Sequence, residues 1–71
     1  MKLTALIEKS EDGWFVGQLE EFPEVLSQGK TVSEVKTNLL DALNVLVDAN
    51  REIVASNNKD KKVIREQLDV V

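Results

Sequence analysis

The side chains of this chain that could act as acids or bases near neutral pH are its carboxylates, because its 71 residues include no histidine, cysteine or tyrosine. Glu20 and Glu21 are neighbours on an extended segment, so their side chains point to opposite sides and make a poor acid–base pair. The serines lack a histidine that would activate them as nucleophiles. We therefore expect a protein that is not an enzyme.

Sites for phosphate groups or metal ions are not indicated either. The glycines at positions 13, 17 and 29 do not form a phosphate-binding loop. The carboxylates lack the spacing of a calcium-binding EF-hand loop, and without cysteine there is no thiolate metal site. The sequence thus predicts no cofactor and no bound metal.

The negative charge of the chain is concentrated in one segment. The net charge is −4 and the pI is about 4.7, which argues against binding nucleic acid through a basic surface. Residues 10–29 carry five acidic side chains and no basic one, whereas the rest of the chain is nearly neutral. Two interpretations stay open: a solvated loop region, or an acidic patch that steers a basic partner toward the protein.

Three strands are predicted in the first part of the chain, where these acids lie. Residues 2–9 alternate with the period of two that is typical of a strand. The Asp-Gly pair that follows is a strong hairpin-turn signal, and residues 14–20 supply the second strand. Gly17, in the middle of that strand, is predicted to let a helix sit tightly on the sheet. Pro23 cannot donate to a ladder, so the chain leaves the sheet there before a short third strand over 25–28.

A helix is predicted to follow a turn at the third glycine. Thr31 and Glu34 have the spacing of a capping box, in which the hydroxyl accepts a free backbone N–H and the carboxylate reaches back. From Val32 the apolar side chains recur with a helical period, and the helix is predicted to end near residues 55–57. The apolar stripe consists of Val35, Leu39, Leu43, Leu46 and Ile53. Residues 63–71 are predicted to form a final strand, although their alternation is weak.

The predicted fold is therefore a single α+β domain over residues 1–71 with the order β-β-β-α-β. A helix that returns to a parallel strand must cross right-handed. This places strand four beside strand one, in a mixed sheet of order 3-2-1-4 with the helix on one face. The other face carries Leu6, Trp14 and Val16. We expect either this face or the apolar surface of the helix, which Val45 and Val47 broaden beyond what a small sheet must cover, to form a dimer or partner interface. The alternative is that Trp14 is an ordinary half-exposed aromatic side chain of a sheet.

The small size of the chain also favours self-association. A domain of this length buries only about 60% of its unfolded surface, and there is no disulfide to stabilise it. We therefore expect a homo-oligomer, either a dimer or a tetramer. The sequence shows no signal peptide and no apolar run long enough to span a membrane, so a cytoplasmic protein without membrane contact is expected.

Residues 12–35 follow a specific order: an Asp-Gly turn, a strand with an aromatic residue, a loop with proline, and a glycine turn before a capped helix. The positions that carry this pattern are Phe15, Val16, Leu19, Glu21, Phe22, Pro23, Ser27, Gly29, Thr31 and Glu34. In this pattern the chain resembles the HicB-like antitoxin domain family, in its short single-domain form. The family usually has glycine after the proline, where this chain has Glu24. A glycine that needs a positive φ is not freely replaced by glutamate, so a reshaped loop is expected.

The resemblance implies a partial RNase H-like fold without that fold's catalytic acids. It implies an antitoxin of a type II toxin–antitoxin system, which neutralises a small basic mRNA-cleaving toxin of the HicA type by covering its active site. We expect Glu20, Glu21, Phe22 and Glu24 to contact that toxin. Many family members bind promoter DNA through a C-terminal module, for which a chain ending at Val71 leaves no room, so no direct nucleic-acid binding is expected.

Two further interpretations stay open. The first is an orphan HicB-like module that forms homo-oligomers in another assembly and has no toxin partner. The second, weaker one is an accessory subunit that binds a small ligand, for which the sequence offers no convergent polar cluster.

Overall fold

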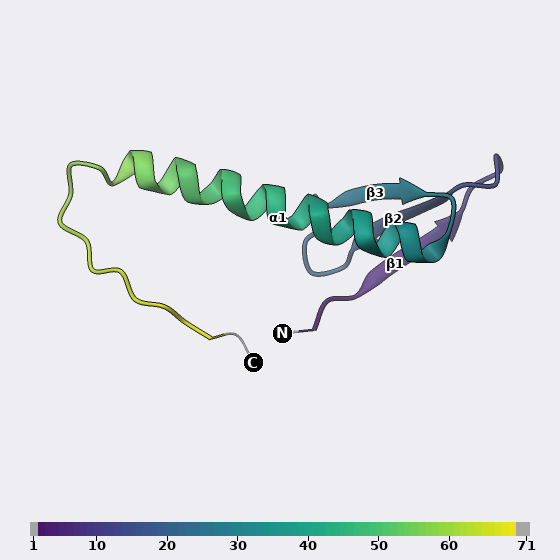
Figure 1. The fold of residues 1–71 in the computed structure, drawn as a ribbon, viewed down its shortest axis with the longest axis horizontal. Coiled ribbons are helices and arrows are strands. Elements are labelled where there is room, and N and C mark those ends of the chain that lie inside the picture. Colours follow the sequence, from purple (N-terminus) through teal and green to yellow (C-terminus); the bar gives the residue numbers. More distant parts are fainter. Residues whose placement is uncertain (1, 70–71) are drawn as a thin grey trace.

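The computed structural model describes residues 2–69, which form one sheet and one long helix (Figure 1). The three strands are β1 (Ala5–Lys9), β2 (Phe15–Leu19) and β3 (Leu26–Gly29), and the helix is α1 (Val32–Asn57). The strands are antiparallel neighbours in the order β1-β2-β3, and α1 packs on one face of the sheet. The predicted α+β class is thus confirmed, together with the order of the first three strands.

The hairpin between β1 and β2 closes at Gly13, whose φ of 89° lies in the region that favours glycine. Asp12 fixes this turn, because its carboxylate accepts hydrogen bonds from the Ser10 hydroxyl and, at 3.0 Å, from the Trp14 backbone N–H. The bond from Ser10, and to a smaller extent the bond from Trp14, lowers the pKa of Asp12 below its ordinary value. The register that follows pairs Lys9 with Phe15.

The core lies between the inner face of the sheet and the first half of α1. Leu19, Val25, Val35 and Leu39 are buried there. The partly buried side chains packed around them are Leu3, Ala5, Ile7, Phe15, Phe22, Ala42, Leu43 and Leu46. The N-terminal part of the predicted apolar stripe of α1 therefore faces the sheet, as expected.

Both ends of α1 agree with the sequence prediction. The Thr31 hydroxyl accepts a hydrogen bond of 3.1 Å from the Glu34 backbone N–H, as in a capping box. The Glu34 carboxylate, however, accepts from the backbone N–H of Lys30, at 2.8 Å, one residue earlier than the motif predicts. At the other end Asn58 caps the helix, and its side-chain amide donates to the Val54 carbonyl at 2.8 Å.

The predicted fourth strand is not formed within residues 63–69, which carry no regular secondary structure. Residues 70 and 71 of the predicted strand lie outside the described part of the chain. The reason lies in the weak alternation: Glu66 would share a side with Ile64 and Leu68, so one side of such a strand would carry a charge. Three parts of the predicted fold stay predictions: the fourth position in the 3-2-1-4 order, the parallel pairing of strand four with strand one, and the partial RNase H-like fold.

The helix is much longer than the sheet that it covers. Its 26 residues span about 39 Å, whereas a strand of five residues spans about 17 Å. Buried and half-buried positions within α1 end at Leu46. Residues 47–57, here called the distal helix, therefore extend beyond the sheet, and the chain then runs back beneath them toward its C-terminus (Figure 1).

Gly17 offers a test of how closely α1 sits on the sheet. A Cβ at this position would lie 2.5 Å from Val35 Cγ1 and 3.1 Å from Leu39 Cδ1. We expect Gly17→Ala to lower the free energy of unfolding by about 1–3 kcal/mol, because the core must shift to admit the methyl group. Urea denaturation measures this, with Gln28→Ala on the exposed face of β3 as the control. Equal stability of the two variants would contradict the close packing.

Candidate partner-binding surfaces

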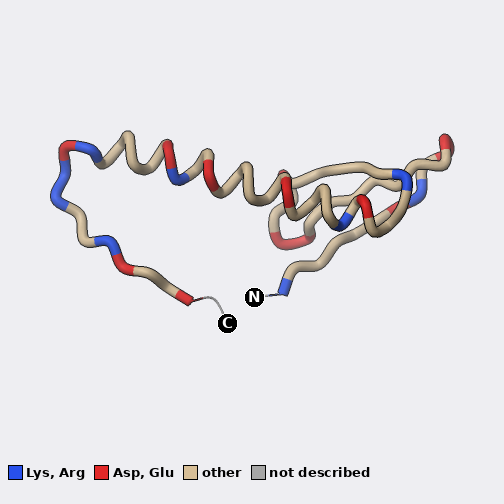
Figure 2. Tube along the Cα trace, in the orientation of Figure 1, with Lys and Arg blue, Asp and Glu red and all other residues tan. Residues whose placement is uncertain are grey.

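The acidic loop, defined as residues 20–24, joins β2 to β3 at the end of the sheet from which the distal helix extends (Figures 1 and 2). Its backbone is tightly held. The Val25 N–H donates to the Phe22 carbonyl at 2.9 Å, and the Leu19 N–H donates to the Val25 carbonyl at 3.1 Å. The Gln18 side-chain amide adds a bond of 2.8 Å to the Pro23 carbonyl. The loop thus presents its acidic side chains from a fixed backbone.

The predicted partner-binding residues in this loop have different surroundings. Glu20 and Glu24 are exposed. Phe22 is half-buried and packs against the core, so it anchors the loop and presents only part of its ring to a partner. Glu21 accepts a hydrogen bond of 2.7 Å from the Thr4 backbone N–H, just before β1. That bond lowers the pKa of Glu21 from its ordinary value of 4.5, against a smaller opposing effect of desolvation.

Glu24 stands where the family pattern usually has glycine, and the expected reshaping of the loop there stays a prediction. Among the residues that the structure describes, no residue other than glycine has a positive φ. Glu24 therefore occupies an ordinary backbone conformation, and the loop does not need the glycine that the family pattern usually places there.

The outer face of the sheet carries the second predicted surface. The strand register aligns Leu6 with Gln18 and Gln18 with Leu26, so these side chains form one row across the sheet. Val16 lies beside this row and Trp14 at the hairpin end, and all four apolar side chains are exposed, from 37% for Trp14 to 64% for Leu26. The Lys30 ammonium lies 5.6 Å from the centroid of the Trp14 ring, within reach of a cation–π interaction.

Leu26 was absent from the predicted interface, although the sequence contained the signal. Val25 lies in the core, so the alternation of the third strand places the next residue on the opposite face. Leu6, Val16 and Leu26 together supply one exposed apolar side chain from each strand.

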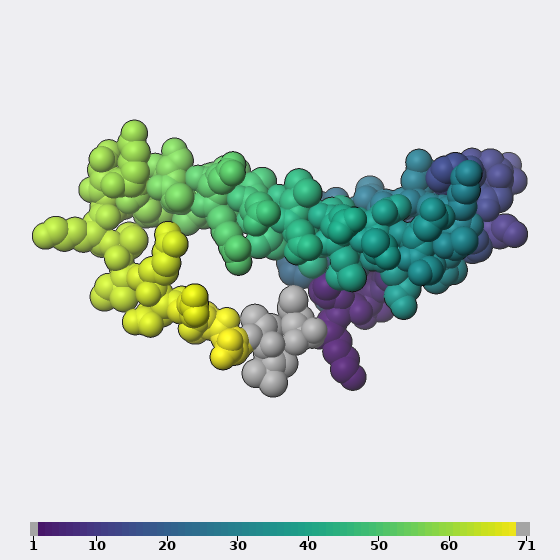
Figure 3. All heavy atoms as spheres, viewed as in Figure 1, coloured from purple at the N-terminus to yellow at the C-terminus, as the bar shows by residue number. Residues whose placement is uncertain are grey.

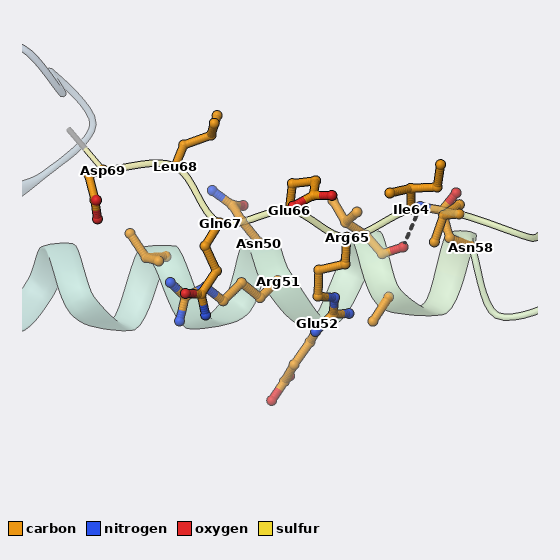
Figure 4. A pocket seen from close by; sticks show the side chains of 14 residues that line it. Asn50, Arg51, Glu52, Asn58, Ile64, Arg65, Glu66, Gln67, Leu68 and Asp69 are labelled. Carbon is orange, nitrogen blue, oxygen red and sulfur yellow. Dashed lines mark hydrogen bonds between the residues drawn. The ribbon is translucent and has the colours of Figure 1, made fainter.

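A third surface lies along the distal helix, whose apolar side was among the expected interfaces, but the groove beside it was not predicted. An open groove lies between the distal helix and the returning residues 63–69, and Figure 4 shows the side chains that line it from both sides. Ile64 and Leu68 are both 88% exposed, so the returning segment scarcely covers the helix. The space-filling view in Figure 3 shows this segment beneath the green half of the helix.

Two other kinds of site are not observed within residues 2–69. There is no group of three or more His, Cys, Asp or Glu side chains arranged to hold a metal ion. Helix α1 is also not apolar enough over a sufficient length to cross a membrane.

Two relatives identify the family. The chain is 35% identical over 49 residues to UPF0150 protein Ta0767 of Thermoplasma acidophilum, covering 69% of this chain and 71% of the relative. It is 37% identical over 51 residues to UPF0150 protein ssl0738 of Synechocystis, covering 72% of this chain and 71% of the relative. The chain therefore belongs to the UPF0150 family, which is the HicB-like family. No family model matches the chain, and no solved structure matches it significantly.

The Glu21 hydrogen bond predicts a specific pH dependence of stability. Because its pKa is lowered in the folded state, ionised Glu21 stabilises the fold above the ordinary pKa of 4.5, and this contribution is lost as the pH falls through the lower folded value. We expect Glu21→Gln to lower the urea midpoint at neutral pH, and this effect to disappear as the pH falls through the folded-state pKa of Glu21. Glu20→Gln is the matched control and should show no such difference. A constant effect of Glu21→Gln across this range would contradict the assignment.

Proposed function

We propose that this protein is an antitoxin-like binding protein of a type II toxin–antitoxin system. It neutralises a small basic mRNA-cleaving toxin of the HicA type by binding it directly. Membership of the HicB-like family supports this, since the family is associated with toxin–antitoxin systems. The observation that carries the proposal is the acidic loop, where exposed Glu20 and Glu24 project from a fixed backbone.

The physical argument concerns charge and preorganisation. Residues 10–29 contain no basic side chain, so nothing within this segment neutralises the loop. A basic surface is attracted to such a loop over about one Debye length, roughly 8 Å at physiological salt, and the attraction mainly accelerates association. The hydrogen-bonded backbone needs little further ordering when a partner binds, which lowers the entropic cost of the complex.

The remaining parts of the proposal follow from the same role. The protein acts by covering a partner, so it needs no catalytic residue, cofactor or metal of its own. It does not bind nucleic acid directly, because its net charge is −4. We expect both proteins in the cytoplasm, where the toxin's mRNA substrate is found.

Charge reversal in the loop tests the proposal. We expect Glu20→Lys with Glu24→Lys to slow association with a HicA-type toxin by about tenfold at low salt, with a smaller effect on dissociation. Glu21 is left intact, because its carboxylate holds Thr4. Stopped-flow mixing with a fluorescently labelled toxin measures the rates, because Trp14 lies at the opposite end of β2 from the loop.

The matched control reverses two exposed acids at the hairpin end of the sheet, Glu8→Lys with Glu11→Lys, which changes the net charge equally. If both double variants slow association to the same extent, the effect comes from overall charge and the acidic loop is not the docking site. If neither changes the rate, the electrostatic part of the proposal is wrong.

The outer face of the sheet favours a second candidate function, an orphan module that builds a homo-oligomer without a toxin. Its supporting observation is the row of exposed apolar side chains that joins Leu6 and Leu26 across the sheet. Such a face loses contact with water when it packs on an identical face, at about 25 cal/mol for each Å² buried.

Trp14→Asp tests that candidate, because a charge at the hairpin end opposes its own copy across a self-complementary interface. We expect the variant to halve the mass of the assembly in light scattering. Circular dichroism should stay unchanged, since Trp14 is partly exposed and lies outside the buried core. An unchanged mass would exclude the outer face as the interface.

A further inference from the structure

The distal helix continues the core-facing apolar stripe of α1 after the sheet has ended. Leu43, Val47, Asn50 and Val54 follow one another at spacings of four, three and four residues. Leu46 and Ile53 lie beside them at the same period. Ile53 and Val54 are nonetheless 59% and 57% exposed. An apolar stripe that keeps helical spacing but covers nothing is typical of a helix that packs against another helix.

The shape of the chain indicates that this packing partner is missing from a single copy. The radius of gyration is 15.9 Å, whereas a compact domain of this length has about 11 Å. The longest dimension, 52 Å, runs from the β1–β2 hairpin along α1 to the turn that follows the distal helix (Figure 1). Because that segment leaves an open groove beside the helix, the chain does not close its own core there (Figures 3 and 4).

We propose that a second copy of this chain occupies the groove, with the two distal helices packed antiparallel around a twofold axis. Eleven residues, 47–57, extend beyond the sheet and span about 16 Å. The overlap is centred on Asn50, two residues before the middle of this segment, so the axis passes next to Asn50. The two Asn50 residues then face each other across the axis, between helices whose axes are about 8–10 Å apart.

Asn50 suits a position on this axis. It lies in the middle of the stripe, with apolar side chains before and after it, and it lines the groove (Figure 4). An amide carries both a donor and an acceptor, so two symmetry-related asparagines can bond to each other. A single asparagine within an apolar helix seam is a known means of fixing the register and the number of helices.

The charges at the two ends of the overlap match as well. The basic turn, residues 59–62, carries Lys59, Lys61 and Lys62 with one acid, and it stands at the tip of the distal helix (Figure 2). The acidic loop lies where the distal helix leaves the sheet. When the helices overlap antiparallel, the tip of each copy reaches the base of the other. The basic turn of one copy thus meets the acidic loop of the other, twice in the dimer.

This charge match favours a second copy, and not an unrelated helix, as the occupant of the groove, because the chain itself supplies both the basic and the acidic side of the contact. The inference does not rest on the proposed toxin binding and is tested with this chain alone. If both hold, a basic toxin and the basic turn compete for the same acidic loop, so the toxin would also weaken the dimer.

Asn50→Asp tests the axis, because it places two like charges together in the dimer. In the monomer the same substitution changes an exposed position. We expect the dimer dissociation constant to rise roughly tenfold or more, and Asn50→Leu to lower it. Sedimentation equilibrium measures both. The matched control is Asn44→Asp, which adds the same charge to the same helix before the distal helix begins, about 120° around the helix axis from Asn50. A wild-type monomer, or equal effects of Asn44→Asp and Asn50→Asp, would overturn the proposal.

A charge swap tests the ends of the overlap. Glu20→Lys with Glu24→Lys, and separately Lys59→Glu with Lys62→Glu, should each weaken the dimer at low salt. All four substitutions together should restore it, because every contact then regains opposite charges. A combined variant as weak as either pair alone would overturn the contact. No toxin is present, so this outcome is independent of whether a toxin binds.

Discussion

The structure depends on one mismatch: the apolar stripe of α1 is about twice as long as the sheet that covers it. The half over the sheet builds the core through Val35 and Leu39, with Gly17 removing the side chain that would hold the helix away. The other half carries the same kind of residues and no cover. A domain this small has little hydrophobic free energy to lose, so leaving half of its longest apolar surface in water would be costly. The proposed dimer would remove that cost without disulfides or metals.

Local signals in the sequence predicted local structure well. The Asp-Gly pair and the capping box gave the hairpin at Gly13 and the helix start at Thr31, because both depend on residues within one turn of each other. The fourth strand was different, since its pairing would depend on a distant edge and not on its own residues. The alternation around Glu66 was too weak to predict that pairing, and residues 63–69 form no strand.

The candidate surfaces were predictable to different degrees for the same reason. Exposure of the acids at positions 20 and 24 followed from composition, but the inward turn of Phe22 and the Thr4 bond of Glu21 depend on how the loop meets the rest of the fold. The groove could not be predicted, because the expected fourth strand led the chain back onto the sheet. The acidic loop now has two candidate occupants, a basic toxin and the basic turn of a second copy, and the same electrostatic attraction serves both.

Hydrogen exchange at different protein concentrations tests most directly whether the distal helix is an interface. In a single copy its amides lie in an exposed helix end that opens easily, whereas in the dimer they are covered. We predict that exchange of residues 47–57 slows as the concentration rises through the dissociation constant, while exchange of β2 changes little. Exchange of the distal helix that stays independent of concentration would contradict the account.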